Sequence, residues 1–439
     1  MNKLLARVFA LLNQESIPYC VLRWVDELEQ PDEGHDVDLL VQRREFARMR
    51  HALTDLGFVP LPAWGHAPHH FFVAYEEDSD CWIKLDIVTD IAFGRPAHVL
   101  YTPLADICLQ NRCRHDLTFV LSPEEELVTL LLHCVVDEGG ITPREGSRLK
   151  FLCDQVVDQQ YVTLLLTTYY LPDMSFSKLA PLIQVADWET LLARRNETKG
   201  YLTRLDRLGT FFRQVGYPAL RKLERVICFF RPQTFTVALL APDGAGKSTL
   251  ATNIEKSFLL PVRSIYMGLY PGRRNRIGSE VPGIHRRTGV PVLGLLGHLC
   301  TQWKRYFLAR YHVACGRLVI FDRYTYDALL PPNQSMSRIK RWRRWLLAHA
   351  CPAPEFILFL DAPGKLLYAR KGEGSAAALE QQRQHYRALK LDFPQMIMVD
   401  ATQSADQVRR QATSLIWNRY VRRLGPGGRK PRLMGGREG

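Results

Sequence analysis

The sequence predicts an α/β fold in which a C-terminal, doubly wound, five-stranded parallel sheet follows a mixed α/β unit and a helical connector. Two observations carry this prediction. After residue 232, five β-type runs alternate with helix-length stretches, which is the pattern of a parallel sheet with crossover helices. The first of these runs leads into a glycine-rich segment and then a helix-compatible run, an order typical of a phosphate-binding loop.

Composition sets the broad class of protein. At 439 residues the chain has room for two or three domains, and a hydrophobic content of 46% indicates a folded protein. No apolar run reaches the ~18 residues that span a bilayer, and we expect no signal peptide because Arg7 interrupts the apolar N-terminal stretch. The ten cysteines show no Cys-x-x-Cys pairing, so we expect reduced thiols, no zinc site and a cytoplasmic protein.

We divide the chain into four parts. Residues 1–120 form the N-terminal α/β unit, 121–231 the helical connector, 232–421 the parallel-sheet domain, and 422–439 a disordered basic tail rich in Gly, Pro and Arg. In the first part, apolar runs predict strands at 18–22, 37–41, 71–75 and 82–88, with a helix at 44–56.

Three carboxylates are expected on one face of the N-terminal unit. Asp36 and Asp38 stand at i and i+2 along a predicted strand and therefore point to the same side. Asp86 belongs to a second predicted strand, and by the same alternation it faces away from the apolar positions of that strand. Two neighbouring acids with a third from a second strand are how a pair of Mg2+ ions is held for nucleotidyl transfer. All three are therefore candidate metal ligands.

This arrangement resembles the nucleotidyltransferase fold over residues 16–120. That family carries a Gly-Ser or Gly-Gly pair before the paired acids, which holds the triphosphate, whereas this chain has Leu22-Arg23-Trp24. Arg23 either replaces the glycine pair electrostatically or marks a domain that binds without catalysing. Outward-facing acids on a half-exposed strand are the plainer alternative. His69 and His70 are interpreted as structural or surface residues, not as ligands.

The connector is predicted to be helical. Ser122-Pro123-Glu124-Glu125 has the form of a capping box with proline at the first helical position, and an apolar run follows it. Helix breaks are expected at Gly139-Gly140, at Leu171-Pro172 and at 216–218, where glycine and proline punctuate the pattern. No residue of this part indicates chemistry.

The C-terminal domain is expected to present its functional residues where the parallel strands end. The predicted strands cover residues 235–240, 263–267, 318–321, 356–360 and 396–399. After the first of them comes Ala-Pro-Asp-Gly-Ala-Gly-Lys-Ser-Thr, residues 241–249. Consecutive backbone N–H groups in such a loop, together with the positive end of the following helix, suit the phosphates of a nucleoside triphosphate.

Each part of this loop has an expected role. Lys247 is expected to reach the β- and γ-phosphates of ATP, and the Ser248 hydroxyl to ligate Mg2+. Ala241 departs from the usual motif, which begins with glycine. The expected ATP cradle comprises Gly244, Ala245, Gly246, Lys247, Ser248 and Thr249.

Further motifs give this domain a family resemblance. The loop, Asp322-Arg323-Tyr324, Leu-Asp-Ala-Pro at 360–363 and Val-Asp-Ala-Thr at 399–402 stand in the order and spacing of thymidylate-kinase-type nucleoside monophosphate kinases. The resemblance covers residues 233–420. It implies a P-loop kinase fold and phosphoryl transfer from ATP with Mg2+, with Lys247 among the catalytic residues.

The resemblance also assigns roles to individual positions. Asp243 matches a loop carboxylate beside the acceptor. Asp322 and Arg323 match an Asp-Arg pair that lies near the metal and grips the acceptor phosphate. Arg370 and Lys371 begin the stretch where the family has a mobile lid, which supplies cations to the transferring phosphoryl group and binds the nucleotide.

Two features of the domain have no single interpretation. Asp361, at the end of the fourth predicted strand, either lies near the metal as a ligand or caps the next helix. The Arg-Glu-Pro-Gly-type acceptor segment of the family is replaced by the stretch 266–276, which is rich in arginine. Thymidylate itself is therefore not expected as the acceptor.

Positive charge is concentrated in one part of the chain. Residues 261–350 hold 16 Lys and Arg against three acids, an excess equal to the net charge of +13 of the whole chain. This excess indicates either an anionic partner or a solvated face. Within it, 338–347 forms either an amphipathic helix on anionic membrane or a solvated helix beside the acceptor site. No recognised module supports nucleic-acid binding.

We therefore predict an ATP- and Mg2+-dependent phosphotransferase. Its acceptor is expected to be a small anionic or hydroxyl-bearing metabolite, namely a nucleotide, a sugar or a sugar phosphate. With a nucleotidyltransferase-like N-terminal unit, such a protein would phosphorylate and then nucleotidylate one metabolite. Two alternatives stay open, a regulatory protein that uses ATP as a switch and a polynucleotide-directed kinase. The oligomeric state is also open, a homodimer included.

Overall fold

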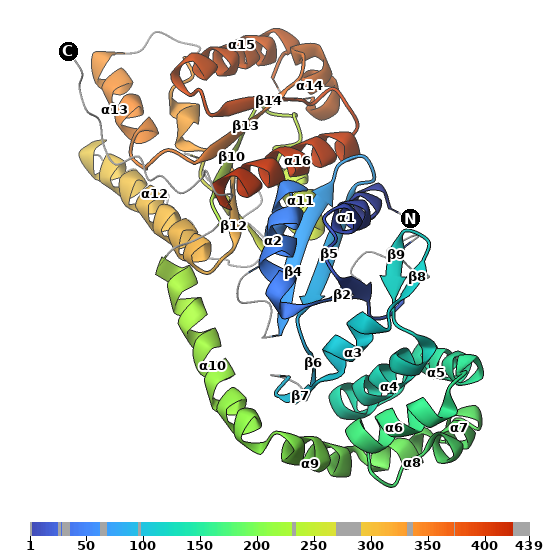
Figure 1. Cartoon of the computed structure of the whole chain (residues 1–439). Coiled ribbons are helices and arrows are strands. Elements are labelled where there is room, and N and C mark those ends of the chain that lie inside the picture. The colour runs from blue at the N-terminus through green and yellow to red at the C-terminus, as the bar shows by residue number, and fades with distance from the viewer. Residues whose placement is uncertain are drawn as a thin grey trace, which may run out of the picture. The chain divides into compact units, whose positions relative to one another are not determined.

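The computed structural model describes residues 2–24, 28, 36–61, 68–94, 98–230, 234–268, 291–331, 337–372 and 374–424 (Figure 1). Contacts divide the chain into two compact units, Met1–Val226 and Ile227–Gly439. Each unit has hydrophobic clusters of its own. The sequence-based domain boundaries near residues 120 and 231 stay predictions.

A mixed seven-stranded sheet organises the first unit. Its strands follow the order β3-β4-β5-β2-β1-β9-β8. Strand β2 runs parallel to β5, and this register places Asp38 opposite Asp86. A short antiparallel pair, β6 (Ile91–Phe93) with β7 (Leu100–Thr102), forms a separate ribbon. The strands of the sheet are β1 (Tyr19–Val21), β2 (Asp36–Val41), β3 (Val59–Pro60), β4 (His69–Glu76), β5 (Cys81–Val88), β8 (Cys113–His115) and β9 (Thr118–Val120).

Helices pack against both faces of this sheet. Because side chains alternate along a strand, Leu39 enters a core with α1 (Lys3–Gln14) and α2 (Phe46–Asp55), while Leu40 enters the core of the helical region. The helical region comprises α3 (Leu104–Gln110), α4 (Pro123–Leu132), the π-helix η3 (His133–Glu138), α5 (Pro143–Gln155), α6 (Gln159–Tyr169), α7 (Phe176–Gln184), α8 (Trp188–Ala193), α9 (Arg195–Leu205) and α10 (Arg207–Phe230). The four strands and the helix that we predicted for residues 1–120 are confirmed.

The start of α4 follows the sequence signal only in part. The Ser122 side chain accepts a hydrogen bond from the Glu125 backbone N–H, and Pro123 occupies the first turn. The reciprocal half of the predicted capping box is wrong. The Glu125 carboxylate instead accepts hydrogen bonds from Asn111 and Tyr161, two polar groups that tertiary packing brings to it.

One predicted helix break is wrong and two are confirmed. Helix α10 continues through residues 216–218 although it contains Pro218. Proline removes one intrahelical donor, but the carbonyl left without it belongs to Gln214, an exposed residue that water reaches. The other two breaks are present, since η3 ends at Glu138 and is capped by Gly139 with φ 68°, and α6 ends at Tyr169.

A five-stranded sheet organises the second unit, and each strand is parallel to its neighbours. The order is β11-β12-β10-β13-β14, so the chain builds one side of β10 first and the other side afterwards. The connections thus reverse direction at β10, which is where doubly wound sheets generally bind their ligands. All five predicted strands are present as β10 (Thr236–Leu240), β11 (Val262–Tyr266), β12 (Leu318–Asp322), β13 (Phe356–Asp361) and β14 (Met396–Asp400).

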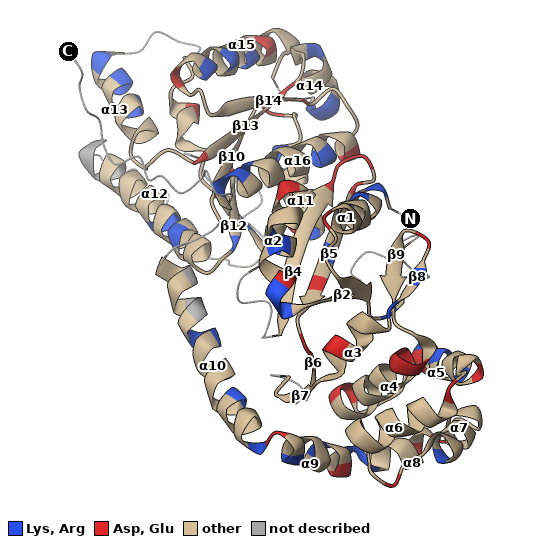
Figure 2. Ribbon diagram, in the orientation of Figure 1, with Lys and Arg blue, Asp and Glu red and all other residues tan. Residues whose placement is uncertain are grey.

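Helices cover both faces of the parallel sheet. Ala309 of α12 and Tyr386 of α15 share a core with Ala238 of β10 on one face, whereas α11 and α16 contact each other and lie outside that core. Figure 2 shows Lys and Arg gathered along α13. The helices are α11 (Lys247–Ser257), α12 (Pro291–Ala314), α13 (Arg338–Ala348), α14 (Gly364–Lys371), α15 (Ala376–Asp392) and α16 (Ala405–Leu424).

The C-terminal helix corrects the expected start of the tail. We predicted disorder from residue 422, but α16 continues to Leu424. Tyr420 is buried and Arg423 is ion-paired with Glu355, and these contacts hold the last helical turn. The rest of the predicted tail, 425–439, and most of the expected acceptor segment lie outside the described residues.

Among the described residues, no helix is long and apolar enough to cross a membrane. The nine cysteines whose side chains are described are free thiols. A cytoplasmic location stays a prediction.

Candidate active site

The phosphate-loop motif forms a turn between β10 and α11, at the point where the connections of the parallel sheet reverse. Gly244 and Gly246 both have φ of +87°, a conformation that glycine adopts at little cost. A Cβ on Gly244 would lie 2.7 Å from the Leu367 carbonyl oxygen, so α14 closes one side of the loop. A Cβ on Gly246 would meet no atom of the described residues within 4 Å, its chain neighbours aside. The loop is therefore packed at Gly244 and open at Gly246.

Lys247, the first residue of α11, is folded back onto the loop. Its Nζ donates hydrogen bonds to the carbonyl oxygens of Ala241 and Pro242 at 2.7 and 2.8 Å, and the side chain is buried. Burial, reinforced by the positive charge of Arg323, lowers the pKa of Lys247 to about 8. Ala241, the departure from the usual motif, thus supplies one of the two carbonyls that hold this ammonium group.

Ser248 and Asp322 connect the start of α11 with the end of β12. The Ser248 Oγ donates a hydrogen bond to Asp322 Oδ2 at 2.7 Å. Asp322 Oδ1 is buried and has no hydrogen-bond partner among the described residues. A hydroxyl beside a carboxylate with an unsatisfied oxygen is a donor set that suits Mg2+, so these two residues fit the predicted ion. Of the remaining cradle residues, Ala245 is buried and Thr249 is exposed.

Asp243 and Arg323 form the centre of a charged network beside the loop. Arg323 donates to Asp243 Oδ1 at 2.5 Å and also lies 3.6 Å from Asp327. The Tyr386 hydroxyl donates to the other side of this network, at Asp327 Oδ1. Burial raises the pKa of Asp243, but the charges of Lys247, Arg323 and Lys371 outweigh it, so the pKa lies below its ordinary value. Asp243 is therefore held as a carboxylate.

A cavity of about 370 Å³ opens beside Asp243. The described residues that line it include amide and imidazole groups of α15 but no Lys or Arg. The lining residues are Asp243, Leu330, Pro331, Gly374, Ala378, Leu379, Gln381, Gln382 and His385.

The two cations assigned to the lid lie on α14 and face different parts of the domain. Arg370 donates to the Ala401 carbonyl oxygen at 2.8 Å. Lys371 lies next to the loop, since its Cβ is 3.4 Å from the position of a Cβ built on Gly244. The lid role of both residues stays a prediction.

Asp361 is held by arginines of α15. Arg383 contacts both carboxylate oxygens of Asp361, at 2.6 and 3.0 Å, and Arg387 donates to Oδ2 at 2.7 Å. Burial raises the pKa of Asp361, but these two arginines outweigh it and lower the pKa. The capping interpretation is wrong, because Pro363 precedes α14 at the cap position. Metal ligation by Asp361 stays a prediction that requires these ion pairs to open.

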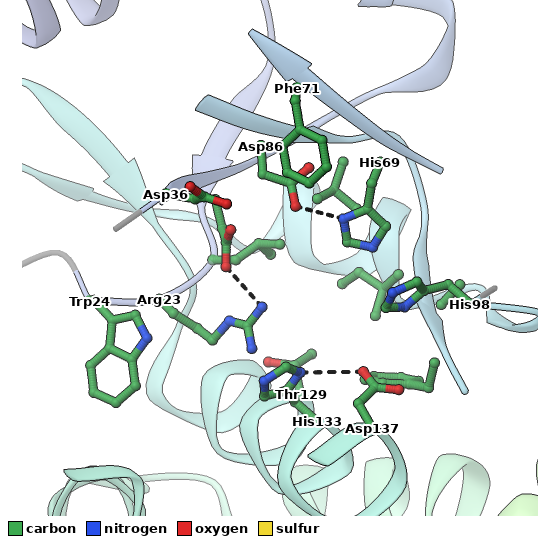
Figure 3. Close-up of a pocket in the computed structure, with 16 residues that line it drawn as sticks. Arg23, Trp24, Asp36, His69, Phe71, Asp86, His98, Thr129, His133 and Asp137 are labelled. Atoms are coloured by element: carbon green, nitrogen blue, oxygen red, sulfur yellow. Dashed lines mark hydrogen bonds and ion pairs between the residues drawn. The ribbon is translucent and has the colours of Figure 1, made fainter. Parts of the chain in front are cut away.

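A second cavity, of about 470 Å³, lies within the first unit (Figure 3). The predicted acids Asp36, Asp38 and Asp86 line it together, as the strand alternation indicated. Each acid contacts a basic group. Lys84 lies 2.7 Å from Asp36, Arg23 lies 2.8 Å from Asp38, and the His69 Nδ1 lies 2.7 Å from Asp86 Oδ2. The three carboxylates are therefore near one another, but each is paired with a side chain of the same unit.

This pairing bears on metal binding in the first unit. The described residues contain no group of three His, Cys, Asp or Glu side chains arranged to hold a metal ion. The predicted two-metal arrangement at Asp36, Asp38 and Asp86 thus does not fit the side chains as they stand. Asp86 Oδ1 is buried without a hydrogen-bond partner among the described residues, and this oxygen atom favours a ligand.

The sequence analysis missed the place of His69 at this cavity. We interpreted His69 as structural or surface, but it lines the cavity and pairs with Asp86. A signal was present in the sequence, because His69 and Phe71 alternate along β4 onto the face that carries Asp86. The His98 ring lies 4.4 Å from the His69 ring.

The connector also contributes to this cavity, although we found no chemistry in its sequence. Thr129 of α4 and His133 and Asp137 of η3 line the wall opposite the sheet (Figure 3). His133 contacts Asp137 at 3.3 Å, and Asp137 accepts a hydrogen bond from the Gly94 backbone N–H. The π-helical turn brings His133 and Asp137 to the same wall, and turns of this kind are frequent at functional sites.

Comparison with known proteins adds a partial likeness to kinases. No protein-family model matches this chain, and no curated protein matches it. A solved structure of deoxyadenosine kinase from M. mycoides with bound dATP is similar over 41% of this chain and 98% of its own, with 13% identity and a TM-score of 0.31. Thymidylate kinase from Candida albicans is similar over 43% of this chain and 93% of its own, with 18% identity and a TM-score of 0.32. Likeness at TM-scores this low decides neither the fold nor the activity of this chain.

Proposed function

We propose that this chain is an ATP- and Mg2+-dependent phosphotransferase that acts on a small acceptor bound in the Asp243 cavity. One observation carries the proposal. The phosphate-loop motif stands where the strand connections reverse, next to the Ser248–Asp322 contact and to a cavity lined by Asp243. Phosphoryl transfer needs in-line positioning and charge neutralisation, and these residues supply both.

The loop would bind ATP through its backbone. The N–H groups of residues 244–249 and the positive end of α11 would hold the phosphates, with Lys247 exchanging its two loop carbonyls for phosphate oxygens. Ser248 and Asp322 would hold Mg2+, which neutralises charge on the transferring phosphoryl group.

Asp243 would accept a proton from the acceptor hydroxyl. The hydroxyl oxygen forms a bond to the γ-phosphorus as the bond to the bridging oxygen breaks, and ADP leaves. Arg323 positions the Asp243 carboxylate and, with Lys247, keeps it ionised. Gln381, Gln382 and His385 would hydrogen-bond the acceptor, which we propose to be a nucleotide, a sugar or a sugar phosphate.

The test is ADP formation by the purified chain with ATP and Mg2+ over a panel of nucleosides, nucleotides, sugars and sugar phosphates. Lys247→Ala and Asp322→Asn should each reduce acceptor-dependent ADP formation by at least ~10²-fold. Lys256→Ala, an exposed lysine of the same helix, is the matched control. Acceptor-dependent ADP formation that survives in both variants would contradict the proposal.

The same panel separates the two alternatives. Tight ATP binding with slow turnover that no acceptor accelerates would indicate an ATP-dependent switch. An oligonucleotide that accelerates turnover, with binding that falls steeply as salt rises, would indicate a polynucleotide-directed kinase.

A second proposal concerns the first unit. We infer that the cavity around Asp38 and Asp86 is a separate ligand site, and the resemblance to nucleotidyltransferases makes nucleotidyl transfer the reaction to test there. The register that sets these two acids opposite each other supports it. Metal ligation would require Arg23, Lys84 or His69 to give up its carboxylate partner.

Calorimetric titration of nucleoside triphosphates with Mg2+ tests this second site. The titration uses the Lys247→Ala chain, so that the phosphate loop contributes little to the measured binding. A second sample carries Asp38→Asn and Asp86→Asn in addition to Lys247→Ala. Binding that disappears with the added pair supports the site, and pyrophosphate release in the presence of the phosphorylated acceptor supports nucleotidyl transfer. Binding unaffected by the added pair would contradict the site.

A further inference from the structure

Helix α13 has an unusual surface. Its 11 residues, Arg338–Ala348, include five Lys or Arg and no acid. Ile339, Trp342 and Trp345 follow one another at three-residue spacing and are 78%, 59% and 55% exposed. Large apolar side chains at this spacing form a stripe along one side of a helix. This stripe points to solvent in the described structure, whereas a surface helix of a soluble protein normally packs such a stripe against the protein core.

The opposite side of α13 holds the helix to the domain. Leu347 and Ala348 are buried. Arg344 donates from Nε to the Ala328 carbonyl oxygen at 2.9 Å and from Nη2 to the Leu330 carbonyl oxygen at 2.7 Å. The helix is therefore fixed with its tryptophans outward, and it is fixed to Leu330, which lines the Asp243 cavity.

A second helix beside it carries a similar stripe. Helix α12 contacts α13. Its residues Trp303, Phe307 and Tyr311 stand at four-residue spacing and are exposed, with the rings of Trp303 and Phe307 5.3 Å apart. Lys304 and Arg310 lie between them and are also exposed. Exposed aromatic residues flanked by cations thus occur on two contacting helices.

We propose that the α13 surface, extended by α12, binds a lipid bilayer with anionic headgroups. Tryptophan rings occupy the boundary between headgroups and acyl chains, and arginine and lysine lie at the headgroup level around them. The cations Arg338, Arg341 and Arg343 flank the Trp342 stripe and would attract an anionic leaflet. Since no described helix can span a bilayer, the contact is one of a helix lying on the surface. On its other side, the same helix adjoins the rim of the Asp243 cavity through the contact of Arg344 with Leu330.

The experiment is co-sedimentation of the full chain with phosphatidylcholine vesicles that contain or lack phosphatidylglycerol. We expect binding to the anionic vesicles only, and weaker binding as salt rises. One variant, Trp342→Ala with Trp345→Ala, removes the inserting rings. Another, with Arg338, Arg341 and Arg343 changed to Gln, removes three cations. Each should weaken binding by at least ~10-fold.

Matched controls separate this surface from general charge and hydrophobicity. Leu391→Ala removes an exposed apolar side chain of α15, and a variant with Lys256, Lys390 and Arg419 changed to Gln removes three exposed cations elsewhere. Both controls should bind as the unchanged chain does. Circular dichroism confirms that each variant is folded.

Several results would overturn the proposal. The first is no binding to anionic vesicles at low salt, and the second is full binding by either α13 variant. A third is a dimer in sedimentation velocity that the tryptophan variant abolishes, since the stripe would then pair with a second copy. A fourth is oligonucleotide binding that depends on α13 while vesicle binding does not.

Discussion

The Ser248 hydroxyl donates a 2.7 Å hydrogen bond to the Asp322 carboxylate, and this contact joins two segments that are 74 residues apart in sequence. Neighbouring parallel strands make it possible, because β10 and β12 pair in register and end at the same edge of the sheet. The second oxygen of Asp322 is buried without a partner among the described residues. The site thus contains a polar group that a cation would satisfy.

ATP affinity should fall as pH rises through about 8. Burial lowers the pKa of Lys247 to about 8, so the free chain loses this positive charge well below the usual range of lysine near ~10.4. Calorimetry at several pH values between about 7 and about 9 measures the effect. Lys247→Arg is the control, because a guanidinium keeps its charge in this window. Equal ATP affinity of the unchanged chain across the window would contradict the prediction.

Lys247 should also make the free energy of unfolding rise with pH, whereas it makes ATP affinity fall. In the unfolded chain its pKa is near ~10.4, so between about pH 8 and that value the unfolded state binds more protons. The free energy of unfolding from this group therefore rises with pH over that range. Denaturant unfolding of the unchanged chain and of Lys247→Met provides the comparison, and the rise should be absent in the variant.

Arg323→Gln should move the acid limb of kinase activity to higher pH. The charges of Lys247, Arg323 and Lys371 lower the pKa of Asp243 against the effect of burial, so removing one of them raises it. Asp243 would then become protonated earlier as pH falls, and activity would be lost earlier. The pH dependence of kcat/KM with a saturating concentration of ATP measures the shift. An unchanged acid limb in a variant that retains activity would show that Asp243 is not the group that titrates.

Two glycine substitutions in the loop should have different effects. Gly244→Ala places a Cβ 2.7 Å from the Leu367 carbonyl oxygen at a φ of +87°, so it should reduce the free energy of unfolding by about 1–3 kcal/mol. Gly246→Ala has the same φ but open space around the new Cβ, so it should lose about 1 kcal/mol from backbone strain alone. Urea unfolding measures both. Equal losses would mean that the packing of α14 on the loop does not matter.

The His69–Asp86 pair should make stability depend on pH in the neutral range. Burial lowers the pKa of His69, but the hydrogen bond and charge of Asp86 outweigh it, so the pKa lies above 6.5. The folded state then binds more protons than the unfolded state. This contribution is complete below the ordinary histidine pKa and is lost as pH rises through the raised one. Unfolding free energies measured across that range should decline, and His69→Gln and Asp86→Asn should each flatten the decline.

Local sequence patterns predicted much of this molecule. Continuous apolar runs such as 356–360 identified the strands of the parallel sheet, because strands buried on both faces have no polar positions. The Lys247-Ser248 pair after two glycines identified the loop. The failures were at positions where distant groups compete. The Glu125 side chain accepts hydrogen bonds from Asn111 and Tyr161 and does not cap the start of α4. Helix α10 continues through Pro218 because the carbonyl that loses its donor lies on an exposed surface.

By itself, the sequence determined which residues alternate onto one face and which loops follow which strands, since both depend on neighbours along the chain. It placed Asp36, Asp38 and Asp86 on one side and put Asp322 at a strand end. Only the tertiary structure decided which partners those acids have. Strand register brought Lys84 to Asp36, and helix packing brought η3 over the cavity. Such pairings depend on long-range contacts that no local period encodes.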